Sequence, residues 1–160
     1  MGDTHYKATI VWDRGDQVFT DKKFSRAHEL RFDAGLVVPG SPAPSVVPPP
    51  MSREDAVDPE EGLVAAASSC HMLFFLALAA IKGFRVDRYE DPAYGLMSKN
   101  EKGKLFVSKI VLAPQITWSG DTLPEAADIE RLHHRAHEEC YIANSIRAEV
   151  VVEDIEPVFA

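Results

Sequence analysis

Residues 58–83 read DPEEGLVAAASSCHMLFFLALAAIKG, and this segment predicts one long helix. Asp58 is a favourable N-cap, Pro59 suits the first helical position, and the two glutamates that follow complement the positive end of the helix dipole. Gly83 supplies a C-cap, so the helix has about 24 residues and a length of about 36 Å. Because the segment is apolar on nearly every face, the rest of the chain has to surround it.

The length of this segment would also suit a membrane span. Residues 62–81 carry no formal charge apart from any on His71. However, the polar residues Ser68, Ser69, Cys70 and His71 lie at its middle, and the flanking sequence has the pattern of a soluble α+β domain. We therefore expect a buried central helix and no association with a membrane.

Strand-like alternation precedes the helix. It predicts a hairpin of residues 6–12 with 17–20 and a third strand at 28–32. Residues 37–50 contain six prolines and are expected to form an extended surface loop.

The sequence after the helix returns to a strand pattern. Two long strands are expected at 85–97 and 105–118, followed by a helix at 123–139 with Thr122 as its cap and a last strand at 145–155. The resulting order is β-β-β-α-β-β-α-β. It predicts an α+β fold in which an antiparallel sheet wraps around the central helix.

Composition limits the domain count and the partners. A chain of 160 residues with 46% hydrophobic composition fits a single domain over residues 1–160. The net charge of -8 repels a phosphate backbone, so nucleic acid is excluded as a partner. Two cysteines are too few for a disulfide scaffold, and residues 1–6 lack the features of a secretory signal. We therefore expect a cytoplasmic protein.

The two cysteines lie on the two predicted helices. Cys70 is in the long helix and Cys140 closes the second one. A cysteine on an apolar helix is usually an inert core residue. Here, though, it belongs to the polar group at residues 68–71, which costs stability unless its members are paired or in use. Two thiols on different helices can act together, one attacking and one resolving, so a thiol enzyme is the leading hypothesis.

A metal site is an alternative from the same residues. His133, His137 and Cys140 occur at i, i+4 and i+7, which places them within about 60° of arc on one helix face. These are metal-ligand residue types at metal-ligand spacing. A fourth ligand is not evident, and a histidine pair on an exposed helix is commonly just a solvated face.

The run from Asp58 to Cys70 resembles the Asn-Pro-Glu…Ala-Cys helix of the OsmC/Ohr family, the osmotically inducible and organic hydroperoxide resistance proteins. Cys140, in the run HEECYIANS at 137–145, stands where the second helix of that family ends in its other reactive cysteine. The order of elements is also similar, so the resemblance covers nearly the whole chain. It implies a homodimeric thiol-dependent peroxidase with active sites at the subunit interface and with no metal or organic cofactor.

The resemblance also implies roles for individual residues. Cys70 matches the peroxidatic cysteine, Cys140 the resolving cysteine, and Glu60 the glutamate ten positions before the first cysteine. In this scheme Cys70 reduces an organic hydroperoxide to an alcohol and becomes a sulfenic acid. Cys140 then closes an intrachain disulfide, which an external dithiol reduces.

A buried thiol resists ionisation, so a cation is needed beside Cys70. The turn at residues 31–33 resembles the Arg-Phe-acidic turn of the OsmC branch, which makes Arg31 the first choice, with Arg14 and Arg53 as alternatives. Glu60 would hold the guanidinium in a bidentate pair.

Helix geometry adds an expectation about assembly. Ten helical residues separate Glu60 from Cys70 by about 15 Å, on different faces, so if Glu60 serves a site at Cys70, a partner chain has to supply it. A symmetric dimer with antiparallel central helices would do this. The alternative on the same fold is a non-catalytic dimeric module that binds a ligand or senses oxidation through its thiols.

Overall fold

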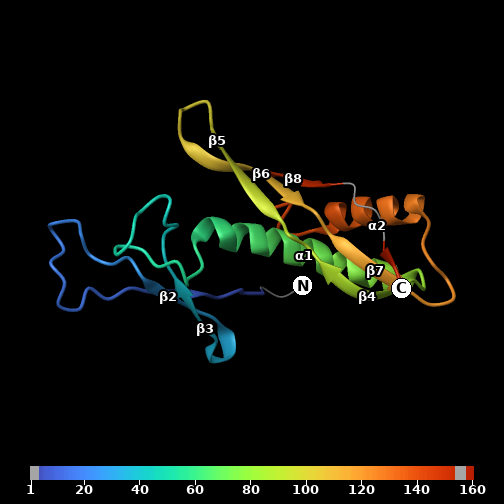
Figure 1. Cartoon of the computed structure of the whole chain (residues 1–160), viewed down its shortest axis with the longest axis horizontal. Helices are drawn as coiled ribbons and strands as arrows, with labels where there is room; N and C mark the ends of the chain where they lie inside the picture. Colours follow the sequence, from blue (N-terminus) through green and yellow to red (C-terminus); the bar gives the residue numbers. More distant parts are fainter. Residues whose placement is uncertain (1–3, 154–157) are drawn as a thin grey trace. The chain divides into compact units, whose positions relative to one another are not determined.

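The computed structural model describes residues 4–153 and 158–160 (Figure 1). It confirms the α+β class, with helices α1 and α2 placed between groups of strands as the sequence predicts. The chain forms two compact units, Met1–Gly62 and Leu63–Ala160. The single domain over residues 1–160 stays a prediction, and each unit is described in turn.

The N-terminal unit contains a three-stranded antiparallel sheet in the order β1-β2-β3. Its strands are β1 (Thr9–Val11), β2 (His28–Arg31) and β3 (Val37–Gly40). The predicted hairpin of residues 6–12 with 17–20 is wrong, because β1 pairs with β2 instead.

Aromatic packing explains why residues 17–20 form no strand. Phe19 stacks on Phe24 with ring centroids 4.6 Å apart, and Trp12 lies against both rings. The apolar residues of this segment therefore fill a cluster within a loop.

The predicted loop at 37–50 is also corrected at its start, since β3 occupies Val37–Gly40. Pro39 is tolerated there because β3 is the last strand of its sheet.

Helix α1 (Pro59–Ile81) follows the sequence prediction closely. The Glu61 N–H donates to the Asp58 carboxylate at 2.8 Å, and the Asp58 N–H donates to the Glu61 side chain at 3.3 Å. These two bonds form a capping box. At the other end Gly83 has a φ of +79°, and the next N–H bonds back to the carbonyl of Ala79 at 3.0 Å. A left-handed residue at this position favours glycine.

The C-terminal unit contains two sheets of three strands. One has the order β4-β7-β9, with β4 (Arg85–Glu90), β7 (Gln115–Ser119) and β9 (Val158–Phe159). The other has the order β5-β6-β8, with β5 (Tyr94–Lys99), β6 (Leu105–Leu112) and β8 (Glu149–Val152). Figure 1 shows the long β5–β6 hairpin with β8 beside β6.

Each long strand predicted after α1 is divided in two. Pro92 lies between β4 and β5, and Pro114 lies between β6 and β7. Proline lacks the N–H that a continuous ladder requires. Asp91, beside Pro92, links the two interruptions, because its carboxylate accepts a hydrogen bond at 2.7 Å from the N–H of Ala113, beside Pro114.

The predicted antiparallel sheet is also corrected in part: β8 runs parallel to β6, and β9 parallel to β7. The α2 crossover between β7 and β8 allows parallel pairing of β8 with β6.

Helix α2 (Ala126–Glu139) is shorter than the predicted helix. Its N-cap is Glu125 in place of Thr122, and Asp128 completes a capping box. The predicted last strand at 145–155 is observed as β8, while residues 154 and 155 lie outside the described residues.

Helix α1 packs against both sheets and α2 within the C-terminal unit. One buried cluster joins it to β6 and β8 and comprises Ala67, Ile110, Leu112, Ala148 and Val150. The other joins it to β7 and α2 and comprises Phe75, Ala79, Ile116, Trp118, Leu132 and Ala136. These contacts bury one face of α1, at Ala67, His71, Phe75 and Ala79, so the prediction of a buried central helix is confirmed for that face only.

One stripe of α1 stays exposed in the single chain. It comprises Ala65, Ser69, Leu73 and Ala77, spaced four residues apart, and is called the exposed α1 stripe below. By length and composition α1 is also the one described helix that could cross a membrane. Its buried residues at positions 67, 71, 75 and 79 pack within the protein.

Candidate functional site

The polar group at the middle of α1 is largely paired. Ser68 donates a hydrogen bond to the carboxylate of Asp91, and Ser69 is exposed to solvent. The next two residues, Cys70 and His71, each contact a residue from the α2 segment. These partners explain how an otherwise apolar helix accommodates four polar residues in succession.

The two cysteines lie together. Cys140 is the C-cap residue of α2, and its thiol lies near enough to the Cys70 thiol for Cys70 to influence its pKa. Both are free thiols. Cys140 is fully buried, whereas Cys70 is partly exposed. A reagent from solvent therefore reaches Cys70 more easily than Cys140.

The environment of Cys140 favours its protonated form. Burial raises the pKa of the Cys140 thiol, because a thiolate is poorly solvated in the core. The backbone N–H of Ala143, 3.4 Å from the sulfur, opposes this rise in pKa, and the nearby Cys70 thiol adds to it. At neutral pH Cys140 is therefore a thiol beside the more accessible sulfur.

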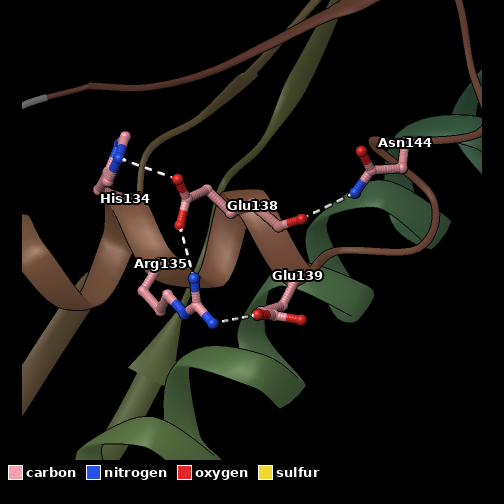
Figure 2. A network of polar contacts seen from close by, with 5 residues as sticks. All are labelled: His134, Arg135, Glu138, Glu139 and Asn144. Atoms are coloured by element: carbon pink, nitrogen blue, oxygen red, sulfur yellow. Dashed lines mark hydrogen bonds and ion pairs between the residues drawn. The ribbon is translucent and has the colours of Figure 1, made fainter.

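Polar contacts hold the end of α2 that presents Cys140 (Figure 2). Arg135 forms ion pairs with Glu138 at 3.0 Å and with Glu139 at 2.6 Å. The Asn144 side chain donates to the backbone carbonyls of Glu138 and Cys140, both at 2.9 Å. The ion pairs are on the surface and each contributes little. The Asn144 bonds satisfy carbonyls that the helix end leaves without partners, and so fix the turn after Cys140.

Two aromatic side chains flank the thiols. Phe74 is one helical turn after Cys70, and Tyr141 directly follows Cys140. Their rings meet edge to face with centroids 5.1 Å apart, and Tyr141 is 68% exposed. The surface beside Cys70 is thus aromatic.

A histidine pair lies in the core next to the thiols. Nε2 of His71 is 3.0 Å from Nδ1 of His133, and the ring planes are 10° apart with centroids 5.3 Å apart, so the two rings meet edge to edge. Burial lowers the pKa of His71 to about 4, with further lowering from His133 and His137. Burial also lowers the pKa of His133 to about 4. Both rings are therefore neutral at pH 7.

The pairing of His133 removes the basis for the metal site considered from the sequence. Within residues 4–153 and 158–160, no three His, Cys, Asp or Glu side chains come together as a metal-binding group. His133 is engaged with His71, and Cys140 departs from helical geometry, with a ψ of 111°, and faces Cys70. Because the backbone leaves the helix at Cys140, the regular spacing that would place Cys140 on one helix face with His133 and His137 is lost.

The sequence did not reveal the contact between His71 and His133. Two features of the sequence could have pointed to this contact: a single histidine inside the apolar helix, and a second histidine on the buried side of an amphipathic helix. Neither feature predicts which residue the histidine contacts, because the two histidines are 62 positions apart in the sequence.

The three candidate arginines lie in the N-terminal unit. Each contacts a residue two or three positions away: Arg31 with Glu29, Arg53 with Asp55, and Arg14 with the carbonyl of Gln17. The ion pairs of Arg31 and Arg53 are exposed, so each guanidinium can exchange its partner at little cost. Glu60 lies in the first turn of α1. The catalytic roles of Arg31 and Glu60 stay predictions.

The comparisons with known proteins agree with this fold. The family model described as OsmC-like protein matches residues 52–153. A solved OsmC-like protein of unknown function from Vibrio cholerae is 49% identical, with a TM-score of 0.93, and the match covers 96% of this chain and 100% of that one. A comparison with curated protein sequences gives no match.

Two more distant structures share the fold. An organic hydroperoxide resistance protein OsmC from Legionella pneumophila has a TM-score of 0.62 at 15% identity, covering 98% of this chain and 96% of that one. The organic hydroperoxide resistance protein OhrB of Bacillus subtilis has a TM-score of 0.58 at 18% identity, covering 98% of both chains. The family match over more than half of the chain, together with the close Vibrio cholerae structure, shows that this protein belongs to the OsmC-like family.

Proposed function

We propose that this protein is a thiol-dependent peroxidase that reduces organic hydroperoxides to alcohols. The observation that carries the proposal is the contact between the partly exposed Cys70 thiol and the buried Cys140 thiol. A peroxidase with two cysteines needs one sulfur that a substrate can reach and a second one near enough to form a disulfide with it.

The reaction proceeds in three steps. The Cys70 thiolate attacks the terminal oxygen of the hydroperoxide, the O–O bond breaks, and the alkoxide leaves as the alcohol after taking a proton. Cys70 is then a sulfenic acid. The Cys140 sulfur attacks the Cys70 sulfur, forms the disulfide, and releases water made from the sulfenic hydroxyl and the thiol proton. An external dithiol returns two electrons and two protons, which restores both thiols.

The surroundings of the thiols support an organic substrate. Phe74 and Tyr141 form an aromatic edge beside the cysteines. Such an edge stabilises an alkyl or aryl group by burial, whereas hydrogen peroxide has no apolar group to bury. The relatives from Legionella pneumophila and Bacillus subtilis are described as organic hydroperoxide resistance proteins, which also supports this class.

The active form in this proposal is a homodimer. The exposed α1 stripe would pack on its copy, since Leu73 alone is 61% exposed in the single chain. Antiparallel packing centred on Ala65 would bring the partner subunit's Glu60 level with Cys70, because the two positions are equally far from that centre.

A positive charge completes the proposed site. Arg31 is the first candidate to stabilise the Cys70 thiolate, with Arg14 and Arg53 as alternatives, and Glu60 would orient the guanidinium. The external dithiol is consistent with a cytoplasmic protein, because the cytosol supplies reduced thiols.

Peroxide consumption tests the proposal. Wild-type protein is mixed with excess cumene hydroperoxide and dithiothreitol, and the remaining peroxide is measured over time. Many turnovers per chain are expected, and Cys70→Ser should reduce the rate to that of dithiothreitol alone while keeping the circular dichroism spectrum. Serine is similar in size to cysteine, so the fold should persist. Consumption that stops at one equivalent in the wild type would instead favour the redox-sensing module.

A further inference from the structure

We propose that the hydrogen bond between His71 and His133 is a positioning device that keeps Cys140 in register with Cys70. This inference rests on one part of the proposed function, namely that Cys70 and Cys140 form a disulfide. It concerns two residues that take no part in the proposed chemistry.

The histidines belong to the same two helices as the thiols. His71 directly follows Cys70 on α1, and His133 lies two turns before Cys140 on α2. Helices α1 and α2 therefore meet at two places: His71 contacts His133, and Cys70 lies near Cys140. A shift of α2 along α1 that opens the imidazole contact would also move the turn that carries Cys140.

The contact is buried and held from the α1 side. His71 has no exposed surface, and the Phe75 ring stacks on His133 with centroids 4.3 Å apart. The other nitrogen of His71, Nδ1, has no hydrogen-bond partner among the described residues. His133 therefore provides the one hydrogen bond of this buried ring within the described chain, and breaking the bond would leave the His71 ring without a partner in the core.

A directional contact does here what apolar packing cannot. Burial of apolar surface has no preferred direction, so α2 could slide slightly along α1 with little loss of burial. Disulfide closure tolerates little sliding, because the two Cα atoms have to lie roughly 4.4–6.8 Å apart. A hydrogen bond of 3.0 Å between two rings fixes the register of the helices. Both imidazoles are neutral, so no repulsion between charges opposes it.

Matched substitutions separate the hydrogen bond from the packing. In His133→Asn the amide occupies the place of Nδ1 and can still bond to His71, whereas His133→Leu has nearly the same shape and cannot. On the other helix, His71→Gln places an amide where Nε2 lies, and His71→Met removes it. Leu132→Val is the control for general loss of stability, because Leu132 is buried on the same helix and both histidines remain.

The measurement is the equilibrium of the protein with glutathione. Two protein thiols and one oxidised glutathione give one protein disulfide and two reduced glutathiones, and the oxidised fraction is read by mass spectrometry after acid quenching. We expect His133→Leu and His71→Met to lower the equilibrium constant for the Cys70–Cys140 disulfide about tenfold, which is about 30 mV for two electrons. His133→Asn, His71→Gln and Leu132→Val should stay within about twofold of the wild type.

The outcomes distinguish this inference from the proposed function. Equal constants for the wild type and the Leu and Met variants, or an equal loss in Leu132→Val, would overturn the positioning role and leave the peroxidase proposal standing. A wild type that forms the disulfide with the expected pattern, but does not turn over peroxide, would support the positioning role and end the peroxidase proposal. A wild type that never forms the disulfide would end both.

Discussion

Nε2 of His71 lies 3.0 Å from Nδ1 of His133, so the two helices that carry the cysteines share a buried hydrogen bond between neutral rings. In this protein the residue after the accessible cysteine is thus a structural contact of the core. Because both rings are neutral in the folded protein, the free energy of unfolding should depend on pH.

Stability should fall as the pH is lowered from about 6.5 to about 4. The pKa of each ring is about 4 in the folded protein and has an ordinary value of 6.5. Between these values the unfolded chain takes up protons that the folded chain does not, so acid favours unfolding. The loss is at most about 3 kcal/mol for each ring.

Urea unfolding at fixed protein concentration, at pH 7, 6, 5 and 4, measures this dependence. The double variant His71→Gln with His133→Asn cannot titrate at these positions and should show a flatter profile. Carboxylates such as Asp128, whose pKa is lowered by the Glu125 N–H and by Arg131, are present in both proteins and cancel. Identical slopes in the wild type and the double variant would contradict the buried, neutral state of the rings.

Cys140→Ser should consume about one equivalent of peroxide per chain and then stop. Without a second thiol the Cys70 sulfenic acid cannot form the disulfide, and it persists or is oxidised further. Mass spectrometry of the variant should show one or more added oxygens on Cys70, whereas oxidised wild type should show an intrachain bond. A bond found only between chains in the wild type would remove the resolving role of Cys140.

Arg31→Ala should slow the alkylation of Cys70 by iodoacetamide at pH 7 and reduce peroxidase activity by about tenfold or more. A fixed cation favours the thiolate, and its loss should be partly compensated at higher pH, where the thiolate forms without help. Glu60→Ala should act in the same direction more weakly, because Glu60 only orients the guanidinium. The same experiment on Arg14→Ala and Arg53→Ala is the comparison: a loss confined to one of these would transfer the role to that arginine.

Leu73→Lys should prevent formation of the proposed homodimer. The substitution places a charge in the exposed α1 stripe, where burial against a second copy would leave it unpaired. Light scattering should give the mass of two chains for the wild type and of one, 17.7 kDa, for the variant. Peroxidase activity should fall with the dimer, because the partner subunit's Glu60 is then missing. Lys82→Glu, at the end of α1 outside this stripe, is the charge-change control. A monomeric wild type would remove the dimer from the proposal.

The sequence by itself determined α1 and the family. The cap at Asp58, the proline after it and the glycine at 83 act on their own neighbours, so the helix bounds could be predicted within one residue. The two cysteine-bearing runs carried the resemblance that the OsmC-like family match confirms. Both kinds of signal lie within short segments of the chain.

The tertiary structure decided which distant residues meet. Local alternation suggested that β1 pairs with the next apolar segment, yet it pairs with β2, because the intervening residues gather around Phe24. The sequence supplied the two cysteines, but only the packing of α2 on α1 brings Cys140 to Cys70 and His133 to His71. Helical periodicity predicts which face a residue occupies. It does not predict the facing partner, because that depends on the register between helices, which is set by contacts between residues far apart in the sequence.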